Sequence, residues 1–181
     1  MRVRPVFLLI AVSACASSGA PQKEGAATDQ TVRIMGAGNT NVTLTSNAGA
    51  QVSRIEAAPD RVWLALPGAY AKVGIPISDV DTVRQRIGNS GLKLRRQLNG
   101  TSLSRFMECG STQIGDNADS YDVFITISST VKKDPVSGLS ALETLFESQA
   151  KPVSFSREYA RCSTKGLLEQ RIVEAVKEQL H

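Results

Sequence analysis

Apolar and polar residues alternate along three short stretches in the first third of the chain, which begin at Thr31, Asn41 and Gln51. Clusters of Gly, Asn and Ser separate these stretches. Alternation with a period of two places apolar side chains on one face of an extended chain, and Gly, Asn and Ser favour turns. The pattern therefore predicts three short strands, over residues 31–35, 41–45 and 51–55.

A helical spacing replaces the alternation after Pro59. Proline fits the first position of a helix, and a glycine such as Gly74 commonly follows the last position. Between these two residues, the apolar positions recur every three or four residues and share one face of a helix: Val62, Trp63, Leu66, Ala69, Tyr70 and Val73. We expect a helix whose apolar face packs against the strands, with a bend or a second segment at Pro67.

The pattern becomes less regular after this helix. Residues 75–83 look extended, and Pro76 indicates that their start is a sheet edge or a strand end. Residues 91–102 give no clear pattern, whereas residues 103–109 predict a strand. Both ends of this part of the chain are thus expected to join a sheet.

The clearest alternation in the chain covers residues 121–131. Asp134 begins a Pro- and Gly-containing turn, and an extended stretch follows over residues 142–151, so the two stretches predict a hairpin. A last strand is expected around residues 157–162.

The end of the chain returns to helical spacing, and Ser163 or Thr164 can cap the start of this helix. Its apolar positions are Leu168, Ile172, Ala175, Val176 and Leu180. The order strands, helix, strands, helix predicts an α+β fold, with a central and a C-terminal helix packed on one antiparallel sheet.

The N-terminus has the pattern of an export signal. Arg2 and Arg4 precede an apolar run over residues 5–12, which is shorter than the roughly 20 residues that span a bilayer. The tetrapeptide that ends at Cys15 resembles the bacterial lipobox, which implies cleavage before Cys15 and acylation, palmitate included, of the new N-terminus. The alternative is an ordinary signal peptide whose removal discards Cys15.

We therefore expect a signal peptide over residues 1–14, a flexible tether over residues 15–30 and a single α+β domain over residues 31–181. The tether is rich in Ala, Ser, Gly and Thr and has little to bury. Ala16 and Ser17 follow Cys15 where an Asp tends to hold lipoproteins at the inner membrane. This favours anchoring at the outer membrane. We expect the domain to face the periplasm, and the opposite face of the outer membrane is the alternative.

Two cysteines remain beyond Cys15. In an oxidising compartment, Cys109 and Cys162 predict a disulfide, and the alternative is two free buried thiols. The chain has 21 Lys and Arg against 17 Asp and Glu. Loss of Arg2 and Arg4 with the signal would leave 19 against 17, so the excess of positive charge belongs mostly to the signal.

The stretch from Asp60 to Asp79 contains Trp63 near a helix start, leucines a turn apart and a Gly-apolar-x-apolar-x-Asp exit that begins at Gly74. It resembles the helix that opens a helix-grip unit in the NlpB family, the C lipoprotein of the outer-membrane β-barrel assembly machine. The resemblance covers about twenty residues. It implies a helix-grip type of sheet, an outer-membrane location and a role beside an envelope protein partner.

Most patterns that suggest catalysis fail on geometry. The only histidine is His181, the last residue, where a frayed end cannot hold a base or a metal. Ser129 and Lys132 fit Ser-x-x-Lys, but residues three apart on a strand point to opposite faces. Ser90 and Lys93 fit the same pattern without the partner motifs of that chemistry.

The clusters of aspartates do not indicate a metal site or a catalytic site either. Asp116, Asp119 and Asp122 are three residues apart, whereas a calcium loop places ligands at alternate positions. Asp79 and Asp81 can share one strand face, as glycosidase carboxylates must converge, but the chain is poor in the aromatic residues that stack on sugars. We expect no enzyme activity, no cofactor and no metal.

One charged feature stands out. Between residues 83 and 105 there are six basic residues and no acidic one: Arg84, Arg86, Lys93, Arg95, Arg96 and Arg105. They suit the phosphates of anionic lipid headgroups, lipopolysaccharide phosphates or an acidic protein surface, and nucleic acid is not expected in the envelope. The alternative is a solvated face that acids elsewhere in the fold neutralise.

The sequence thus predicts a non-enzymatic, lipid-anchored envelope lipoprotein that serves as a structural or assembly accessory subunit. The alternative is a module that binds a small apolar ligand or lipid between helix and sheet. A cavity lined by Trp63 and Tyr70 would favour that alternative.

Overall fold

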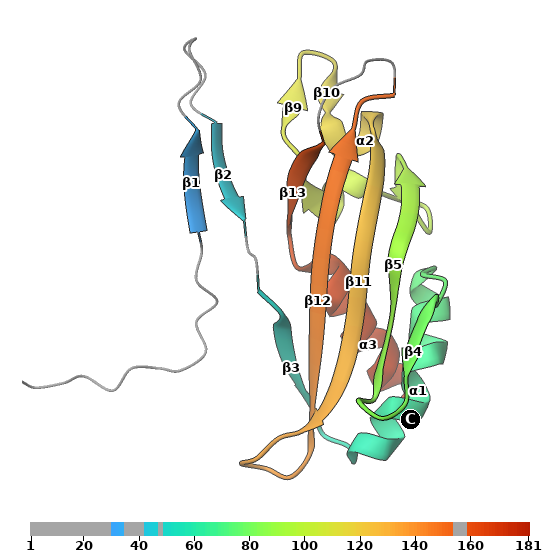
Figure 1. Cartoon of the computed structure of the whole chain (residues 1–181). Helices are drawn as coiled ribbons and strands as arrows, with labels where there is room; N and C mark the ends of the chain where they lie inside the picture. Colours follow the sequence, from blue (N-terminus) through green and yellow to red (C-terminus); the bar gives the residue numbers. More distant parts are fainter. Residues whose placement is uncertain (1–29, 35–41, 47–48, 154–158) are drawn as a thin grey trace, which may run out of the picture.

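A computed structural model of the chain describes residues 30–34, 42–46, 49–153 and 159–181, the first two ranges by their backbone alone. The expected signal peptide and the acylated Cys15 lie outside the described residues. Strands β1 (Gln30–Ile34) and β2 (Val42–Ser46) form an antiparallel hairpin, which stands beside the main sheet (Figure 1).

Two long antiparallel strands form the centre of the main sheet. Strands β11 (Asp122–Lys133) and β12 (Ser140–Lys151) pair along all twelve residues. On the other side of β11 lie β5 (Arg86–Arg95) and then β4 (Asp79–Asp81). These strands fix the two faces of the sheet.

The free side of β12 is shared by two shorter strands. Strand β3 (Gln51–Ile55) pairs with residues 140–144, and β13 (Ala160–Thr164) pairs with residues 148–150. Short elements complete the upper end of the molecule: β6 (Gln97–Leu98), β7 (Thr101–Ser102), η1 (Leu103–Arg105), β8 (Met107–Glu108), β9 (Ser111–Thr112), β10 (Gly115–Asp116) and α2 (Asn117–Ser120).

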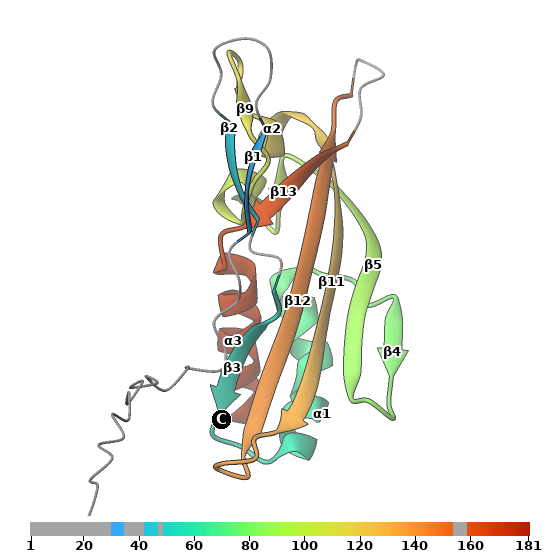
Figure 2. The ribbon, with the colours of Figure 1, turned by 60° about the vertical axis from the view of Figure 1, so that its left-hand side comes forward.

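Helices α1 (Pro59–Val73) and α3 (Leu167–Leu180) pack side by side on one face of the sheet (Figures 1 and 2). We call this the inner face. None of the described helices covers the opposite, outer face. The result is a two-layer α+β fold with a mostly antiparallel sheet, as the sequence predicts.

The core lies between the helices and the inner face. Along β11, side chains alternate between buried and half-buried, and Val123, Ile125 and Ile127 point into the core. Leu66 and Ile172 of the helices are also fully buried. The expected faces of both helices are therefore confirmed, with Trp63 at the margin of the core.

Helix α1 matches its expected bounds, and of the two outcomes expected at Pro67, a bend or a second segment, the second segment is not formed. The helix ends where Gly74 takes a left-handed conformation with φ of 84°. It continues through Pro67 as one helix, so no second segment begins there. Leu66 and Ala69, on either side of the proline, are both buried against the sheet, and this packing holds the helix together.

Two expectations after α1 are wrong in detail, and one strand was not predicted. Of residues 75–83, only residues 79–81 form a strand. Residues 103–109 form a 3-10 turn and a two-residue strand, because Leu103, Phe106 and Met107 are all buried and do not alternate. The sequence pattern did not predict most of β5, because exposed and buried positions alternate over only part of this strand.

The start of α3 also differs from expectation. Its N-cap is Gly166, and no side chain caps it. Thr164 instead donates to Oε1 of Glu169 at 2.7 Å and accepts from the Gly166 N–H at 3.0 Å. The expected strand before α3 is present, displaced to residues 160–164.

The disulfide between Cys109 and Cys162 is confirmed. It joins the segment after β8 to β13 across a sequence separation of 53 residues. Closing a loop of that length stabilises the fold by about 4 kcal/mol on the chain-entropy model. The bond ties the short elements of the upper end to the main sheet.

Among the described glycines, Gly88 has the least room for a side chain, because β5 there lies between β4 and β11. A Cβ at this position would collide with the carbonyl oxygen of Ile127 and the Cα of Ser128. We expect Gly88→Ala to lower the free energy of unfolding by about 2 kcal/mol, since backbone has to move. In Gly91→Ala, the Cβ meets no atom within 4 Å, and the change should stay within about 0.5 kcal/mol. Urea denaturation of both variants measures the difference, and equal stabilities would contradict this account of Gly88.

Candidate functional site

The outer face of the sheet carries a hollow of about 510 Å³, which we call the sheet-face hollow. Its lining comes from β5, β11, β12 and β13: Ser90, Gly91, Phe124, Ile125, Thr126, Leu145, Phe146, Glu147, Ser148, Gln149, Arg161, Cys162, Ser163 and Thr164. Hydroxyl, amide, carboxylate and guanidinium groups thus lie in a single depression with Phe124, whereas the second phenylalanine of the lining, Phe146, is buried. In Figure 1 these strands lie in front of the helices, which leaves their outer face open.

Strand register places four of the outer side chains in one row. Arg161 pairs with Gln149, Gln149 with Phe124, and Phe124 with Lys93. Directly paired residues of neighbouring strands share a face. The row therefore crosses four strands and brings together residues that lie far apart in the sequence.

The adjacent outer row is strongly charged. Lys151 pairs with Asp122, and Asp122 pairs with Arg95. The ammonium of Lys93 lies 2.8 Å from a carboxylate oxygen of Asp122. Within the described part of the chain, no carboxylate lies within ion-pairing distance of Arg95, Lys151 or Arg161.

Two aromatic rings belong to the same region. Phe124 and Tyr159 meet edge to face, with ring centres 5.6 Å apart and planes at 68°. The ammonium of Lys93 lies 5.6 Å from the centre of the Phe124 ring, and that of Lys151 lies 5.1 Å from the centre of the Tyr159 ring. These contacts hold cations and aromatic rings against one another on the outer face.

The six basic residues that were expected to contact an anion lie in different parts of the structure. Lys93 and Arg95 lie at the upper end of β5, and Arg96 follows with a positive φ of 67°. Arg86 lies at the opposite end of β5, about 30 Å away along an extended strand.

The other two basic residues lie elsewhere. Arg84 is in the turn after β4, where its guanidinium lies 3.2 Å from Asp81, and Arg105 is in η1. The six residues thus do not form one surface, and their contact with an anion stays a prediction.

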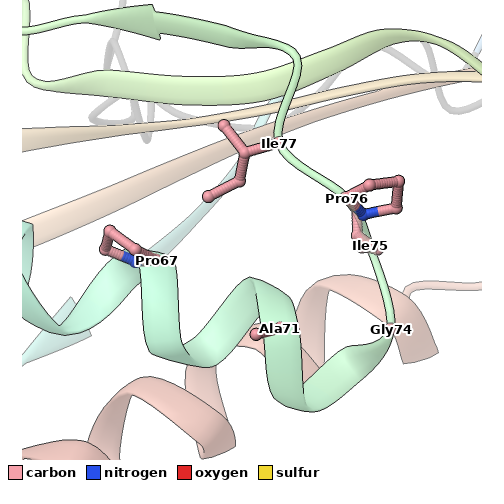
Figure 3. A pocket seen from close by; sticks show the side chains of 6 residues that line it. All are labelled: Pro67, Ala71, Gly74, Ile75, Pro76 and Ile77. Carbon is pink, nitrogen blue, oxygen red and sulfur yellow. The ribbon is translucent and has the colours of Figure 1, made fainter.

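A second depression lies between α1 and the segment that leads to β4. Its volume is about 370 Å³, and its lining is Pro67, Ala71, Gly74, Ile75, Pro76 and Ile77. We call it the α1 groove. In Figure 3, Pro67 and Ala71 lie on the helix side, while Ile77 and Pro76 lie on the segment opposite. None of these six residues carries a charge.

Exposed apolar side chains extend the α1 groove. Leu64 is three residues before Pro67 on α1 and is 77% exposed. Val80 of β4 is 62% exposed and pairs with the buried Ile87, so it points to the inner side of the sheet, where α1 lies. Apolar residues that gather in the open indicate a surface for an interaction.

Asp79 and Asp81 share one face of β4, as expected, but their partners keep both ionised. The Ser78 hydroxyl and the Ser90 N–H donate to Asp79, and these bonds hold its pKa below the usual value. The Arg84 N–H donates to Asp81 and lowers the pKa of that carboxyl as well. A general acid needs a raised pKa, so this pair does not have the character of a glycosidase pair.

A chain of hydroxyl groups crosses the core. The Tyr70 hydroxyl donates to the Ser129 Oγ at 3.0 Å, and Ser129 and Thr144 share a hydrogen bond of 2.9 Å. Burial raises the pKa of Tyr70 to about 12. Ser129 is buried while Lys132 is exposed on the other face beside Glu143, so the Ser-x-x-Lys match has no shared site.

The sequence pattern did not single out the central residues of the sheet-face hollow. Gln149, Glu147 and Arg161 are ordinary polar residues of alternating strands, and only the register unites them with Phe124. One signal was available. Phe124 occupies the polar half of the alternation over residues 121–131, where an aromatic residue has no core to enter.

No group of three metal-ligating side chains occurs in the described ranges, and Asp119 accepts from the Ser104 N–H at 2.9 Å. No helix in those ranges has both the length and the apolar character to cross a membrane. No protein-family model and no curated protein matches the chain.

The raised pKa of Tyr70 predicts a measurable dependence on pH. The unfolded chain releases this proton above pH 10, whereas the folded state holds it up to about pH 12. The free energy of unfolding should therefore be unaffected by Tyr70 below pH 10. It should fall between pH 10 and 12 by at most about 1.4 kcal/mol per pH unit.

In the Tyr70→Phe variant, the free energy of unfolding should lack this part of its dependence on pH. At pH 7 it should be lower than in the wild type by about 1 kcal/mol, because the hydrogen bond of the hydroxyl is missing. Urea denaturation at pH 7, 10 and 11 compares the two proteins. Parallel profiles of wild type and variant would show that the Tyr70 proton does not contribute.

Proposed function

We propose that the chain is a non-enzymatic, lipid-anchored lipoprotein of the cell envelope that binds an envelope protein partner as a structural or assembly accessory subunit. The α1 groove is the observation that carries this proposal. Its six lining residues are uncharged, and Leu64 and Val80 add exposed apolar surface beside it. Covering apolar surface contributes about 25 cal/mol per Å² to binding before the costs of association are subtracted.

The spacing along α1 favours a helix as the part of the partner that binds. Leu64, Pro67 and Ala71 are three and four residues apart, so they lie along one side of the helix. A helix of the partner that lies against this stripe, beneath β4, covers Val80 as well. Such a helix extends the layer of α1 and α3 under the edge of the sheet.

The sequence of the N-terminus supports lipid anchoring. The basic start, the apolar run and the tetrapeptide ending at Cys15 favour acylation at the outer membrane, with the domain facing the periplasm. The disulfide between Cys109 and Cys162 supports an oxidising compartment. A short tether then keeps the α1 groove close to the membrane surface.

The fold type belongs to the same proposal. An antiparallel sheet that carries two packed helices on one face supports the helix-grip type. The resemblance of residues 60–79 to the NlpB family makes components of the barrel assembly machine the first partners to test.

The alternative, an apolar ligand between helix and sheet, gains no support from the described residues. Tyr70 is completely buried, and its hydroxyl is engaged with Ser129. Trp63 and Tyr70 line neither the α1 groove nor the sheet-face hollow. The space expected for such a ligand is occupied by the core itself.

Lipid anchoring is tested at its attachment residue. We expect the intact mass of the mature native protein to equal that of residues 15–181 plus its acyl groups, and the protein to sediment with membranes. Cys15→Ser should lose the added mass and the membrane association together. An unmodified N-terminus in the native protein would contradict the lipoprotein proposal.

Partner binding is tested with a photo-crosslinking amino acid placed in the full-length protein in cells. Placed at Ala71 in the α1 groove, it should yield a reproducible adduct with an envelope protein. The same amino acid at Lys177, an exposed position of α3, serves as the matched control and should yield less of that adduct. Leu64→Asp should reduce the Ala71 adduct at least fivefold without a change in thermal stability. Equal adducts at both positions would contradict a role for the groove.

A further inference from the structure

We propose that the sheet-face hollow binds an acidic saccharide, that is, a sugar that carries phosphate or carboxylate groups. The proposal concerns the outer face of the sheet and is independent of the α1 groove. It rests on the charges, the polar groups and the aromatic ring that strand register brings together there.

The charges around the hollow favour an anion. The two upper outer rows hold four cations, Lys93, Arg95, Lys151 and Arg161, and one carboxylate, Asp122, which Lys93 already neutralises. Lys93 and Arg161 stand at opposite ends of one row and flank the hollow. An arginine fork binds phosphate or carboxylate with two hydrogen bonds, which adds directional recognition to the attraction of charge.

The polar groups inside the hollow favour a ligand that also has hydroxyl groups. Ser90, Thr126 and Ser163 offer hydroxyls, and Gln149 offers an amide. Glu147 contributes a carboxylate, which can only accept hydrogen bonds when ionised. An anion without donors, such as sulfate, is repelled by Glu147, whereas a sugar hydroxyl donates to it. The mixture of two acids with four cations therefore selects a sugar with an acidic substituent.

The aromatic ring provides the apolar contact that such a ligand needs. Phe124 lies in the middle of the Arg161–Gln149–Phe124–Lys93 row, and Tyr159 fixes it edge to face. The C–H face of a sugar ring packs against an aromatic ring through dispersion. A volume of about 510 Å³ also lies within the range of about 300 to 1,000 Å³ that holds small molecules.

A flat anionic membrane fits this region less well than a saccharide does. The surface is hollowed, and Leu145 is the one large aliphatic side chain among its exposed lining residues in the described chain, with 38% exposure. Membrane-binding surfaces combine basic residues with several exposed apolar ones that enter the lipid. The sugar headgroup of a glycolipid and a soluble glycan present the same chemistry, and the experiment below separates them.

The test uses the full-length protein and calorimetric titration at low salt. Trigalacturonate provides a carboxylated sugar and glucose 6-phosphate a phosphorylated one. Maltotriose and glucose are their neutral counterparts, and triglutamate and inorganic phosphate are their counterparts without a sugar. At least one acidic sugar should bind ten or more times tighter than both of its counterparts. Failure of both sugars, or equal binding by a counterpart, would overturn the proposal.

Variants locate the binding. Arg161→Gln should weaken the acidic sugar about tenfold, and Phe124→Leu should do the same while leaving the weak binding of its non-sugar anion unchanged. Arg86→Gln is the matched control, because Arg86 lies on the same strand at the opposite end, and it should have no effect. Thermal melting checks that each variant is folded. Full affinity in both Arg161→Gln and Phe124→Leu would place the binding elsewhere and refute the assignment.

Vesicles then identify the source of the sugar. Vesicles with a phosphorylated glycolipid should bind the protein and release it when the soluble acidic sugar is added, if the natural ligand is held in a membrane. Binding of the soluble sugar without binding to these vesicles assigns the hollow to a soluble glycan. Equal binding to vesicles of phosphatidylglycerol, which has no sugar, would contradict the recognition of a saccharide.

Discussion

The pairing of β11 with β12 is the interaction on which the rest of the fold depends. Every residue of β11 has a partner on β12, and both strands alternate strictly between the two faces of the sheet. One series of side chains forms the floor of the core, and the other forms the outer face. Strands β3, β5 and β13 attach to the free edges of this pair, so their own positions follow from it. A slip of one residue between the two strands would exchange core and surface together.

The part of the chain between β5 and β11 depends on a different kind of constraint. It consists of two- to four-residue elements that have little regular hydrogen bonding of their own. The Cys109–Cys162 bond and the hydrogen bond from the Lys165 N–H to the Phe106 carbonyl fasten it to β13 and to the start of α3. Leu103, Phe106 and Met107 of this segment are also buried in the core, and the covalent link adds to this packing by restricting the unfolded chain.

Local patterns allowed most of the secondary structure to be predicted. Helix α1 and strands β11 and β12 have one buried face each, so the period of their apolar residues reports their conformation directly. Strand β5 was not recognised, because Gly88 and Asn89 occupy buried positions that usually hold apolar residues. Its neighbours impose the strand through pairing, and a single sequence has no record of pairing.

The two depressions could not be predicted either, because they depend on which segments lie side by side in the fold. The disulfide could be predicted because, once Cys15 was set aside as the expected acylation site, Cys162 was the partner left for Cys109 in the sequence. The Arg161–Phe124–Lys93 row depends on the register of four strands, which becomes visible only in three dimensions. The α1 groove depends on the path of the irregular segment after Gly74. This segment has no repeating pattern of apolar and polar residues from which its path could be predicted.

The chain of hydroxyls through the core has a consequence for the uniqueness of the packing. Purely apolar faces can slide against one another at little cost, because dispersion has no direction. Tyr70, Ser129 and Thr144 come from a helix and two strands, and their hydrogen bonds are satisfied in only one alignment of the three. A shift of α1 by one residue would take the buried Tyr70 hydroxyl away from Ser129 and leave it without this partner, which is unfavourable, while Ser129 and Thr144 would stay paired. The hydrogen bonds of these hydroxyl groups therefore fix the position of the helix on the sheet.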